Sequence, residues 1–144
     1  MTVTDAARYL TNHTFPNRKF TRKSVEAQSL ASFVLRENLS IVVASNSYYK
    51  AFKKTKAETE GKFLYAICKG QYDIPALKNF LYTLTDRNQN LKNYKMDYGC
   101  EMIGKRVLFV NAEEAQYENG KAKYIFLTLV DLTPPYYMPL MRFE

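Results

Sequence analysis

The alternation of hydrophobic and polar positions divides the chain into strand-like segments at either end of a helical middle. Two short apolar runs, residues 31–34 and 39–44, are rich in β-branched and aromatic side chains, and the polar residues 36–38 separate them. Runs of this kind, joined by so short a polar connection, predict an antiparallel pair of strands.

At Asn46 the spacing of hydrophobic residues changes from that of a strand to that of a helix. Tyr49 and Phe52 fall on one helical face, whereas Lys50 turns to water. We predict a short helix over residues 46–52. We expect the Asn46 side chain to cap it by accepting a hydrogen bond from a backbone N–H one turn on.

Further helical turns follow this first helix. Thr55 and Glu58 have the spacing of a capping box, which predicts a turn that ends at Gly61. Residues 63–69 are another short apolar piece with helical spacing.

The longest predicted helix begins near residue 73. Asp73 is placed to cap it, and Pro75 lies in the first turn, where a missing N–H costs nothing. Its buried stripe follows the i, i+3, i+4, i+7 pattern and consists of Leu77, Phe80, Leu81 and Leu84.

After residue 90 the hydrophobic period becomes two, which is typical of half-buried strands. The alternation predicts three strands, over residues 94–100, 106–116 and 123–133. Asn119 and Gly120 separate the last two, and this dipeptide predicts a tight hairpin because it accepts positive φ values. The predicted fold class is therefore α+β.

The chain divides into three predicted parts. Residues 1–30 form an N-terminal helical extension, with helical spacing at 4–10 and 24–30. Residues 31–133 form one domain, and residues 134–144 a proline-rich tail. With 144 residues, 47% of them hydrophobic, the chain can build a single buried core.

The charge of the chain argues against one concentrated basic surface. Its net charge is +7, from 21 basic and 14 acidic residues. A nucleic-acid site needs basic side chains gathered along a groove with aromatic residues for stacking. The two basic clusters, at residues 18–23 and 50–56, fit solvated faces better, so we expect no nucleic-acid partner.

No apolar run near the N-terminus is long enough for a signal peptide or a membrane span. We therefore expect a cytoplasmic location, free thiols and no membrane insertion.

Catalytic and metal-binding chemistry lack the residues they need. The single histidine, His13, has no serine or cysteine nucleophile beside it in a recognisable motif. Cys68 and Cys100, with one distant histidine, do not have the spacing of zinc ligands and fit small buried residues. We predict no catalytic residue, no metal site and no enzyme. A small enzyme on a similar α+β fold is the less favoured alternative.

Several short motifs occur in an order that resembles PAS domains. Asn46 with the aromatic pair Tyr49 and Phe52 resembles the N-x-x-(F/Y)-x-x-x-(F/Y)-like helix of that family. Residues 58–62, ETEGK, resemble its E-x-x-G-(K/R) turn, and residues 130–133, VDLT, its terminal D-(I/L/V)-T.

A longer motif narrows the resemblance, which covers residues 31–133. Residues 70–77, GQYDIPAL, resemble the G-Q-W-D-I-P-x-L segment of PAS domains in bacterial sensor histidine kinases and chemotaxis methylesterase/methyltransferase fusion proteins. The resemblance implies a five-stranded antiparallel sheet with helices across one face. It also implies a non-catalytic regulatory module that senses a small molecule or mediates dimer and partner contacts in two-component or chemotaxis signalling. Its partner would be a protein such as a histidine kinase or a chemotaxis protein.

The cofactor is unknown, and the resemblance leaves haem and flavin as alternatives. PAS domains that bind haem often supply a histidine from the long helix, but residues 73–90 contain none. Light-sensing flavin relatives place a cysteine in G-x-N-C-R-F-x-Q. Here residues 61–64 are GKFL, and Cys68 lies further on. After Thr133, prolines replace the helical linker of the family, so the chain is either a module acting in trans or a part of a longer protein.

A candidate ligand cavity lies between the predicted sheet and helices. Apolar walls with a few polar tips suit a small organic ligand, which the tyrosine hydroxyls and Asn46 could orient. The alternative is a solid core, with Asn46 only a structural cap. The candidate lining is Asn46, Tyr49, Phe52, Ile67, Leu77, Phe80, Leu81, Leu84, Tyr94, Met96, Tyr98, Leu108, Val110, Leu127 and Leu129.

The opposite face of the last strands carries Phe109, Phe126 and Thr128. Apolar residues on the far side of a sheet need cover, from residues 1–30 or from a second subunit. We predict a homodimer through this face.

Overall fold

The computed structural model describes residues 18–100 and 102–133. The predicted helix at residues 4–10 and the proline-rich tail lie outside these residues. The strands are β1 (Lys19–Phe20), β2 (Ala31–Leu35), β3 (Ile41–Ala44), β4 (Leu91–Cys100), β5 (Gly104–Tyr117) and β6 (Tyr124–Asp131). The helices are α2 (Arg22–Glu26), α3 (Asn46–Phe52) and α4 (Pro75–Arg87), with short 3-10 turns η2 (Leu64–Ala66) and η3 (Cys68–Gly70).

The five longer strands form the predicted antiparallel arrangement. Their order is β3–β2–β6–β5–β4, and each neighbouring pair is antiparallel. The N-terminal strand pair joins the C-terminal three through β2 and β6, where Phe33 lies opposite Leu127. The α+β class is therefore confirmed.

The sheet is mixed and not purely antiparallel, because β1 adds a sixth, parallel strand. Lys19 lies opposite Gln116, near the end of β5. The pairing of β4 with β5 begins only at Ala112, so the last residues of β5 have no β4 partner on that side. The short strand β1 occupies this part of the edge.

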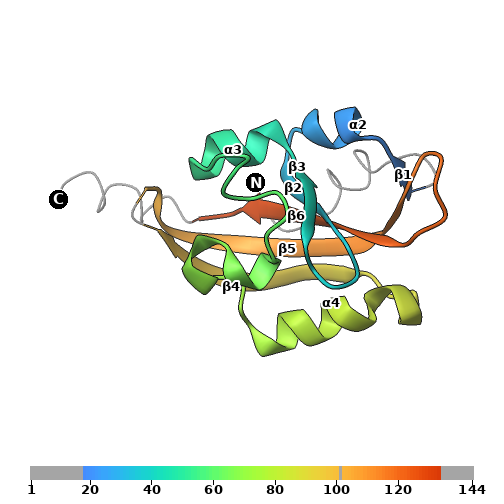
Figure 1. The fold of residues 1–144 in the computed structure, drawn as a ribbon. Coiled ribbons are helices and arrows are strands. Elements are labelled where there is room, and N and C mark those ends of the chain that lie inside the picture. The colour runs from blue at the N-terminus through green and yellow to red at the C-terminus, as the bar shows by residue number, and fades with distance from the viewer. Residues whose placement is uncertain (1–17, 101, 134–144) are drawn as a thin grey trace.

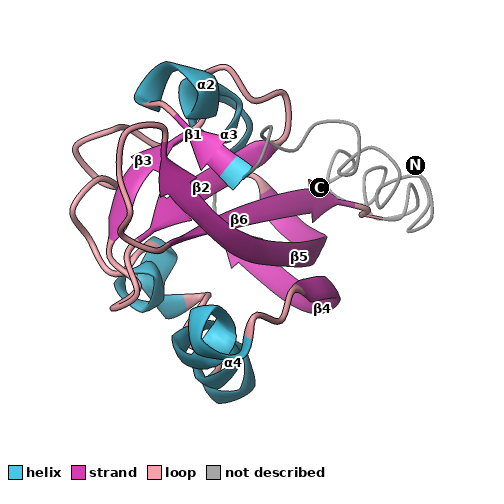
Figure 2. Cartoon of the chain, turned by 90° about the vertical axis from the view of Figure 1, so that its right-hand side faces the viewer, coloured by secondary structure: helices cyan, strands magenta, loops and turns pink. Residues whose placement is uncertain are grey.

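The two faces of the sheet carry separate hydrophobic clusters. The inner cluster lies between the sheet and the helices α3 and α4, and includes Phe33, Leu81 and Leu127. The outer cluster lies under β1 and α2, and includes Phe20 and Phe126. In the view of Figure 1, α4 lies below the strands and α2 lies above them. Figure 2 shows α2 and α4 on opposite sides of the sheet.

Helix α3 begins where the sequence predicts, but a different residue caps it. Ser45 is the N-cap, and its hydroxyl accepts a hydrogen bond from the Tyr48 N–H. Asn46 is the first helical residue and is exposed. The prediction of Asn46 as the cap is therefore wrong. The buried Ser45 hydroxyl also accepts a hydrogen bond from the Ser32 N–H, so it ties the helix to β2 at the same time.

Helix α4 also differs from the prediction at its start. Ile74 is the N-cap and makes no side-chain cap hydrogen bond, so the prediction of Asp73 as the cap is wrong. Asp73 instead forms an ion pair with Lys78, with Oδ1 to Nζ at 2.5 Å. Of the predicted stripe, Leu77, Leu81 and Leu84 are buried, and Phe80 is half-buried.

Two predicted turns have different outcomes. The capping-box hydrogen bonds between Thr55 and Glu58 are present, and the turn ends at Gly61 with φ of 81°. The tight hairpin at Asn119 and Gly120 is wrong, because neither residue has the positive φ that such a turn needs. The connection between β5 and β6 instead spans residues 118–123.

Candidate functional site

The predicted cavity lining belongs, with one exception, to the inner hydrophobic cluster. All of its members except Asn46 belong to the inner cluster or pack against it. Leu77, Leu108 and Leu127 have no exposed surface, and Tyr98 is 2% exposed. Asn46 lies apart from them on the surface, because the chain uses Ser45 and not Asn46 to enter α3.

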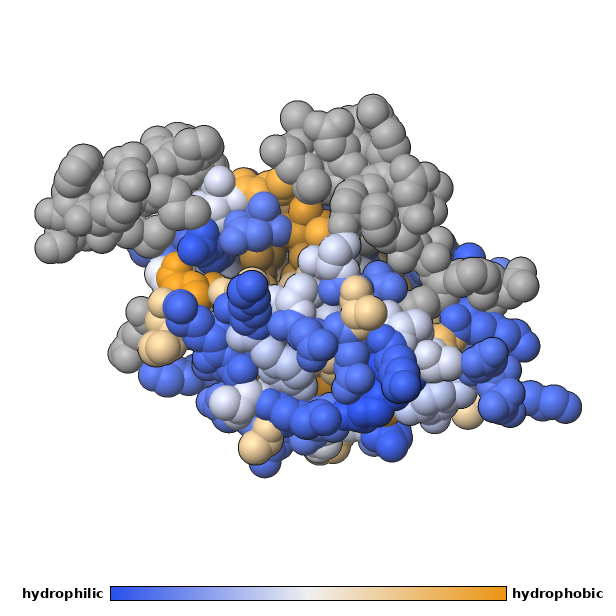
Figure 3. Space-filling view, turned by 90° about the horizontal axis from the view of Figure 1, so that it is seen from above, coloured by the Kyte–Doolittle hydropathy of each residue, from blue (hydrophilic) through white to orange (hydrophobic). Residues whose placement is uncertain are grey.

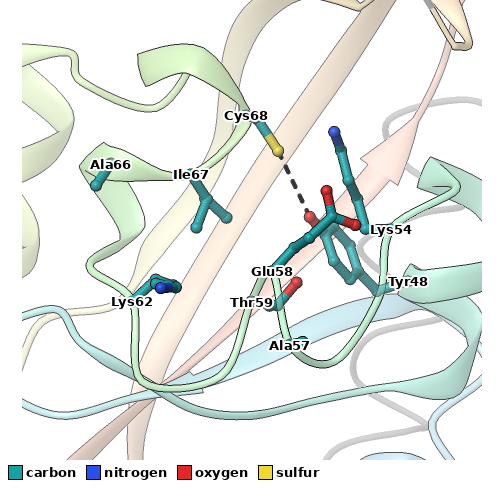
Figure 4. A pocket seen from close by; sticks show the side chains of 9 residues that line it. All are labelled: Tyr48, Lys54, Ala57, Glu58, Thr59, Lys62, Ala66, Ile67 and Cys68. Carbon is teal, nitrogen blue, oxygen red and sulfur yellow. Dashed lines mark hydrogen bonds between the residues drawn. The ribbon is translucent and has the colours of Figure 1, made fainter.

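An open pocket lies at the edge of this core, beside α3 and η3. Its volume is about 530 Å³. Ile67 is the member of the predicted lining that also lines this pocket. Figure 4 shows the side chains around it. They are Tyr48, Lys54, Ala57, Glu58, Thr59, Lys62, Ala66, Ile67 and Cys68.

A second pocket, of about 360 Å³, shares two residues with the first. Lys54 and Cys68 line both pockets. The remaining lining residues of the second pocket are Lys69, Gly99, Cys100 and Met102. Cys68 therefore lies where two hollows of the surface meet.

The backbone at Cys68 is in an unusual conformation. Cys68 has φ of 53° and Lys69 has φ of 56°, so two successive residues with side chains lie in the left-handed region. Such residues cost free energy and persist where the surrounding structure holds them, often at functional sites. The Tyr48 hydroxyl contacts the Cys68 sulfur at 3.6 Å, which fixes the side chain (Figure 4).

Buried tyrosine hydroxyls gather beside Cys68. The rings of Tyr72 and Tyr98 are 5.9 Å apart, and the ring of Tyr48 stacks on Phe52 at 5.0 Å. The hydroxyls of Tyr72 and Tyr98 make no hydrogen bond of normal geometry to the described residues. An unpaired buried hydroxyl costs about 1–3 kcal/mol, so these two groups are candidates to bind a ligand.

Burial raises the pKa of Tyr48, Tyr72 and Tyr98. Nearby groups add to the effect, with the Cys68 thiol raising the pKa of Tyr48 and Tyr98. The three hydroxyls therefore stay protonated at neutral pH and can donate hydrogen bonds.

The rims of the two pockets carry more positive than negative charge. Among the described residues that line the two pockets, Lys54, Lys62 and Lys69 supply ammonium groups, and Glu58 is the one acidic residue. The Thr55 N–H and hydroxyl both donate hydrogen bonds to Glu58 Oε1, and these bonds lower the pKa of Glu58. The lysines at the rim favour a ligand with an anionic group there, and the tyrosine hydroxyls in the core favour hydrogen-bond acceptors on its inner end.

Sequence reasoning missed several residues of this site. Tyr48 was overlooked because its neighbour Tyr49 fits the helical stripe, yet Tyr48 is fully buried and Tyr49 is half-buried. Tyr72 lies in the GQYDIPAL motif, which was the available signal. The prediction that Cys68 and Cys100 are small buried residues is wrong, because both are partly exposed.

On the outer face, the three predicted interface residues differ in exposure. Phe126 is 4% exposed and belongs to the cluster with Phe20 and Val25, and Thr128 is 2% exposed. Phe109 is half-buried. The elements β1 and α2 therefore provide part of the cover that the sequence predicts for this face.

Within the described residues, no group of three or more histidine, cysteine, aspartate or glutamate side chains could hold a metal ion. None of the helices in that same part of the chain has both the length and the apolar composition of a membrane span.

The fold is similar to that of several solved PAS domains. No protein-family model matches the sequence, and no curated protein matches it. The PAS domain of an HTR-like protein from Haloarcula marismortui is 10% identical, with 77% of this chain and 93% of that chain covered and a TM-score of 0.58. The BvgS PAS domain from Bordetella pertussis is 17% identical, with 83% and 89% covered and a TM-score of 0.57.

A third solved structure is the photoactive yellow protein domain of the sensor histidine kinase Ppr from Rhodospirillum centenum. It is 8% identical, with 77% of this chain and 93% of that chain covered and a TM-score of 0.61. The strand order, the helices over the inner face and these matches agree with one another. The chain has the fold of a PAS domain.

Proposed function

We propose that this chain is a non-catalytic regulatory PAS module that binds a small molecule at the pocket beside Cys68. The observation that carries the proposal is the pairing of an open pocket with buried, unsatisfied hydroxyls behind it. The pocket reaches Tyr48 and Cys68. The hydroxyls of Tyr72 and Tyr98, which have no hydrogen-bond partner among the described residues, lie next to them in the core. Ligand sites commonly combine apolar walls with a few convergent polar groups.

The chemistry of the site supports a small organic anion as the ligand. Neutral tyrosine hydroxyls donate to acceptor oxygens, and lysine side chains at the rim attract negative charge. The pockets hold room for a small molecule, since ligand sites typically have volumes of about 300–1,000 Å³.

Signalling of the two-component or chemotaxis type is part of the proposal. One structural neighbour is a domain of a sensor histidine kinase, which supports a kinase or a chemotaxis protein as the partner. Haem or flavin binding is the alternative. An absorbance spectrum of the purified protein distinguishes it from the binding of a colourless small molecule, since both cofactors colour the sample.

A contact role is the second candidate, and the outer face supports it. Phe109 is the least covered of the three predicted interface residues, with Val130 opposite it on β6. A second copy of the chain packed there would form the predicted homodimer, and a native mass spectrum of the full chain reports the oligomeric state.

The same native mass spectrum tests the ligand. We expect a fraction of the protein to retain a small molecule, and we expect Ala66→Trp, which fills the first pocket from its rim, to lose it. Ala51→Trp is the matched control, because Ala51 is also exposed and does not line either pocket. Equal retention by both variants would place the ligand elsewhere. A bare polypeptide mass, with no thermal shift across a panel of small carboxylates and phosphates, would reject the proposal.

A further inference from the structure

Two cysteines line one pocket, and the chain holds them near each other by contacts other than a disulfide. Cys68 on η3 and Cys100 at the end of β4 both line the second pocket, and both thiols are free and partly exposed. A separate contact ties their segments together, because the Gly99 N–H donates a hydrogen bond to the Gln71 side chain at 3.2 Å.

The Tyr98 hydroxyl lies near both sulfurs. Tyr98 is 2% exposed, and its hydroxyl makes no hydrogen bond of normal geometry within the described chain. Both thiols nevertheless interact with it, and each contributes to raising the pKa of Tyr98 after the larger effect of burial. The Tyr98 side chain therefore lies in the neighbourhood of both thiols that line the second pocket.

The segment that carries Cys68 is held in a costly conformation. Cys68 and Lys69 are both left-handed, which costs of order 1–3 kcal/mol for each residue. A change at the Cys68 sulfur that let η3 move would release part of this cost. Lys54 lines both pockets beside Cys68, and its ammonium can donate a hydrogen bond to an oxygen atom leaving from a reagent in either pocket.

We propose that Cys68 is a modification site for hydroperoxides and that Cys100 is its resolving thiol. This goes beyond the binding function, because it needs no ligand in the pocket. A reagent can approach Cys68 from two pockets, since Cys68 lines both and Cys100 lines one.

The reaction has two balanced steps. The Cys68 sulfur attacks the terminal oxygen of the hydroperoxide, so that an S–O bond forms and the O–O bond breaks. The departing oxygen takes up the thiol proton and leaves as an alcohol, or as water from hydrogen peroxide. The Cys100 sulfur then attacks the sulfenic sulfur, an S–S bond forms, and the hydroxyl leaves as water with the Cys100 proton. The two thiols lose two electrons, which the hydroperoxide accepts.

The test uses the full chain, reduced, freed of reductant and treated with hydrogen peroxide. We expect the intact mass to fall by about 2 Da as both thiols disappear, and a peptide map to show Cys68 joined to Cys100. In Cys100→Ser, Cys68 has no resolving thiol, so we expect a gain of about 16 Da that dimedone traps. In Cys68→Ser, we expect Cys100 to react with hydrogen peroxide at least about tenfold more slowly than Cys68 does in Cys100→Ser.

Controls separate this chemistry from general oxidation. Lys54→Ala should slow the first step, whereas Lys50→Ala should not, because Lys50 is exposed and lines neither pocket. Equal oxidation rates for the two single-cysteine variants would overturn the proposal. It would also be overturned if Cys68 were oxidised no faster in the folded protein than in the protein unfolded by urea. A disulfide between two chains, seen as a dimer on a non-reducing gel, would overturn the assignment of Cys100 as the resolving thiol.

Discussion

The two sides of the sheet carry aromatic clusters of similar make-up and different chemistry. On the outer side, Phe20 packs on Tyr117 at 4.4 Å and on Tyr124 at 5.6 Å, and no hydroxyl of this cluster is buried without a partner in the described residues. On the inner side, Phe33 packs on Tyr48 at 4.6 Å, and the nearby hydroxyls of Tyr72 and Tyr98 make no hydrogen bond of normal geometry to the described residues.

This difference concerns the burial of tyrosine hydroxyls on the two sides of the sheet. The outer cluster joins the N-terminal elements β1 and α2 to the five longer strands. Its tyrosines are half-buried, so their hydroxyls can reach solvent. The inner cluster keeps hydroxyl groups in the core at a cost in stability. We infer that the inner side retains them for binding, and that the outer side serves attachment.

The largest expected effect comes from removing one ring on each side. Phe33→Ala should lower the free energy of unfolding by about 4 kcal/mol, because the ring is fully buried between α3 and the sheet. Phe20→Ala should lower it by only about 1 kcal/mol, because β1 and α2 can detach while the rest of the sheet stays folded. Urea denaturation measures both values.

Hydrogen exchange provides the control for this comparison. In Phe20→Ala, we expect faster exchange confined to α2 and to the last residues of β5, which pair with β1. If Phe20→Ala instead accelerated exchange throughout β2 and β6, the outer cluster would be part of the cooperative core, and the distinction between the two sides would fail.

A smaller effect sharpens the comparison within the inner side. Tyr72→Phe removes a fully buried hydroxyl that has no partner among the described residues, and it should raise the free energy of unfolding by about 1 kcal/mol. Tyr48→Phe removes a hydroxyl that contacts the Cys68 sulfur, and it should lower stability by about 0.5 kcal/mol. Thermal denaturation in the absence of ligand measures both. Destabilisation by Tyr72→Phe would show that its hydroxyl already has a partner.

The fold was predictable because its strands and its longest helix carry clear periodicity. The alternation after residue 90 places β4, β5 and β6, and the stripe of Leu77, Leu81 and Leu84 places α4. The caps were not predictable, because Ser45 and Asn46 are both good cap residues. The choice of Ser45 depends on its contact with the Ser32 backbone, which only the tertiary fold creates.

The candidate site was less predictable than the core. Hydrophobic periodicity identified Leu77, Leu108 and Leu127 as inward-facing, but it does not tell a filled core from a cavity. The open pockets depend on the path of the chain from residue 53 to residue 70, which has little regular structure. The left-handed conformation of Cys68 and Lys69 has no signal in a sequence without glycine at those positions.

The smallest expected effect concerns a carboxylate on the outer side. Glu113 lies opposite Phe126 on β6, and burial raises its pKa, while the Arg18 guanidinium acts in the lowering direction. A raised pKa means that the folded state binds the proton more tightly than the unfolded state does. Stability from this group is therefore present at acidic pH, and it is lost as the pH rises from the ordinary value of a glutamate through the raised one.

Glu113→Gln should remove this pH dependence and leave the protein slightly more stable at neutral pH, because the amide needs no proton to stay uncharged. Denaturation curves between about pH 4 and 8 measure the free energy of unfolding, and the difference between the two proteins should change with pH as expected for the titration of a single carboxyl group. Glu118→Gln is the matched control, since Glu118 is exposed in the loop between β5 and β6. If Glu113→Gln were destabilising at neutral pH, the ionised carboxylate would be stabilised by its attraction to Arg18, and the outer side would depend on charge as well as on packing.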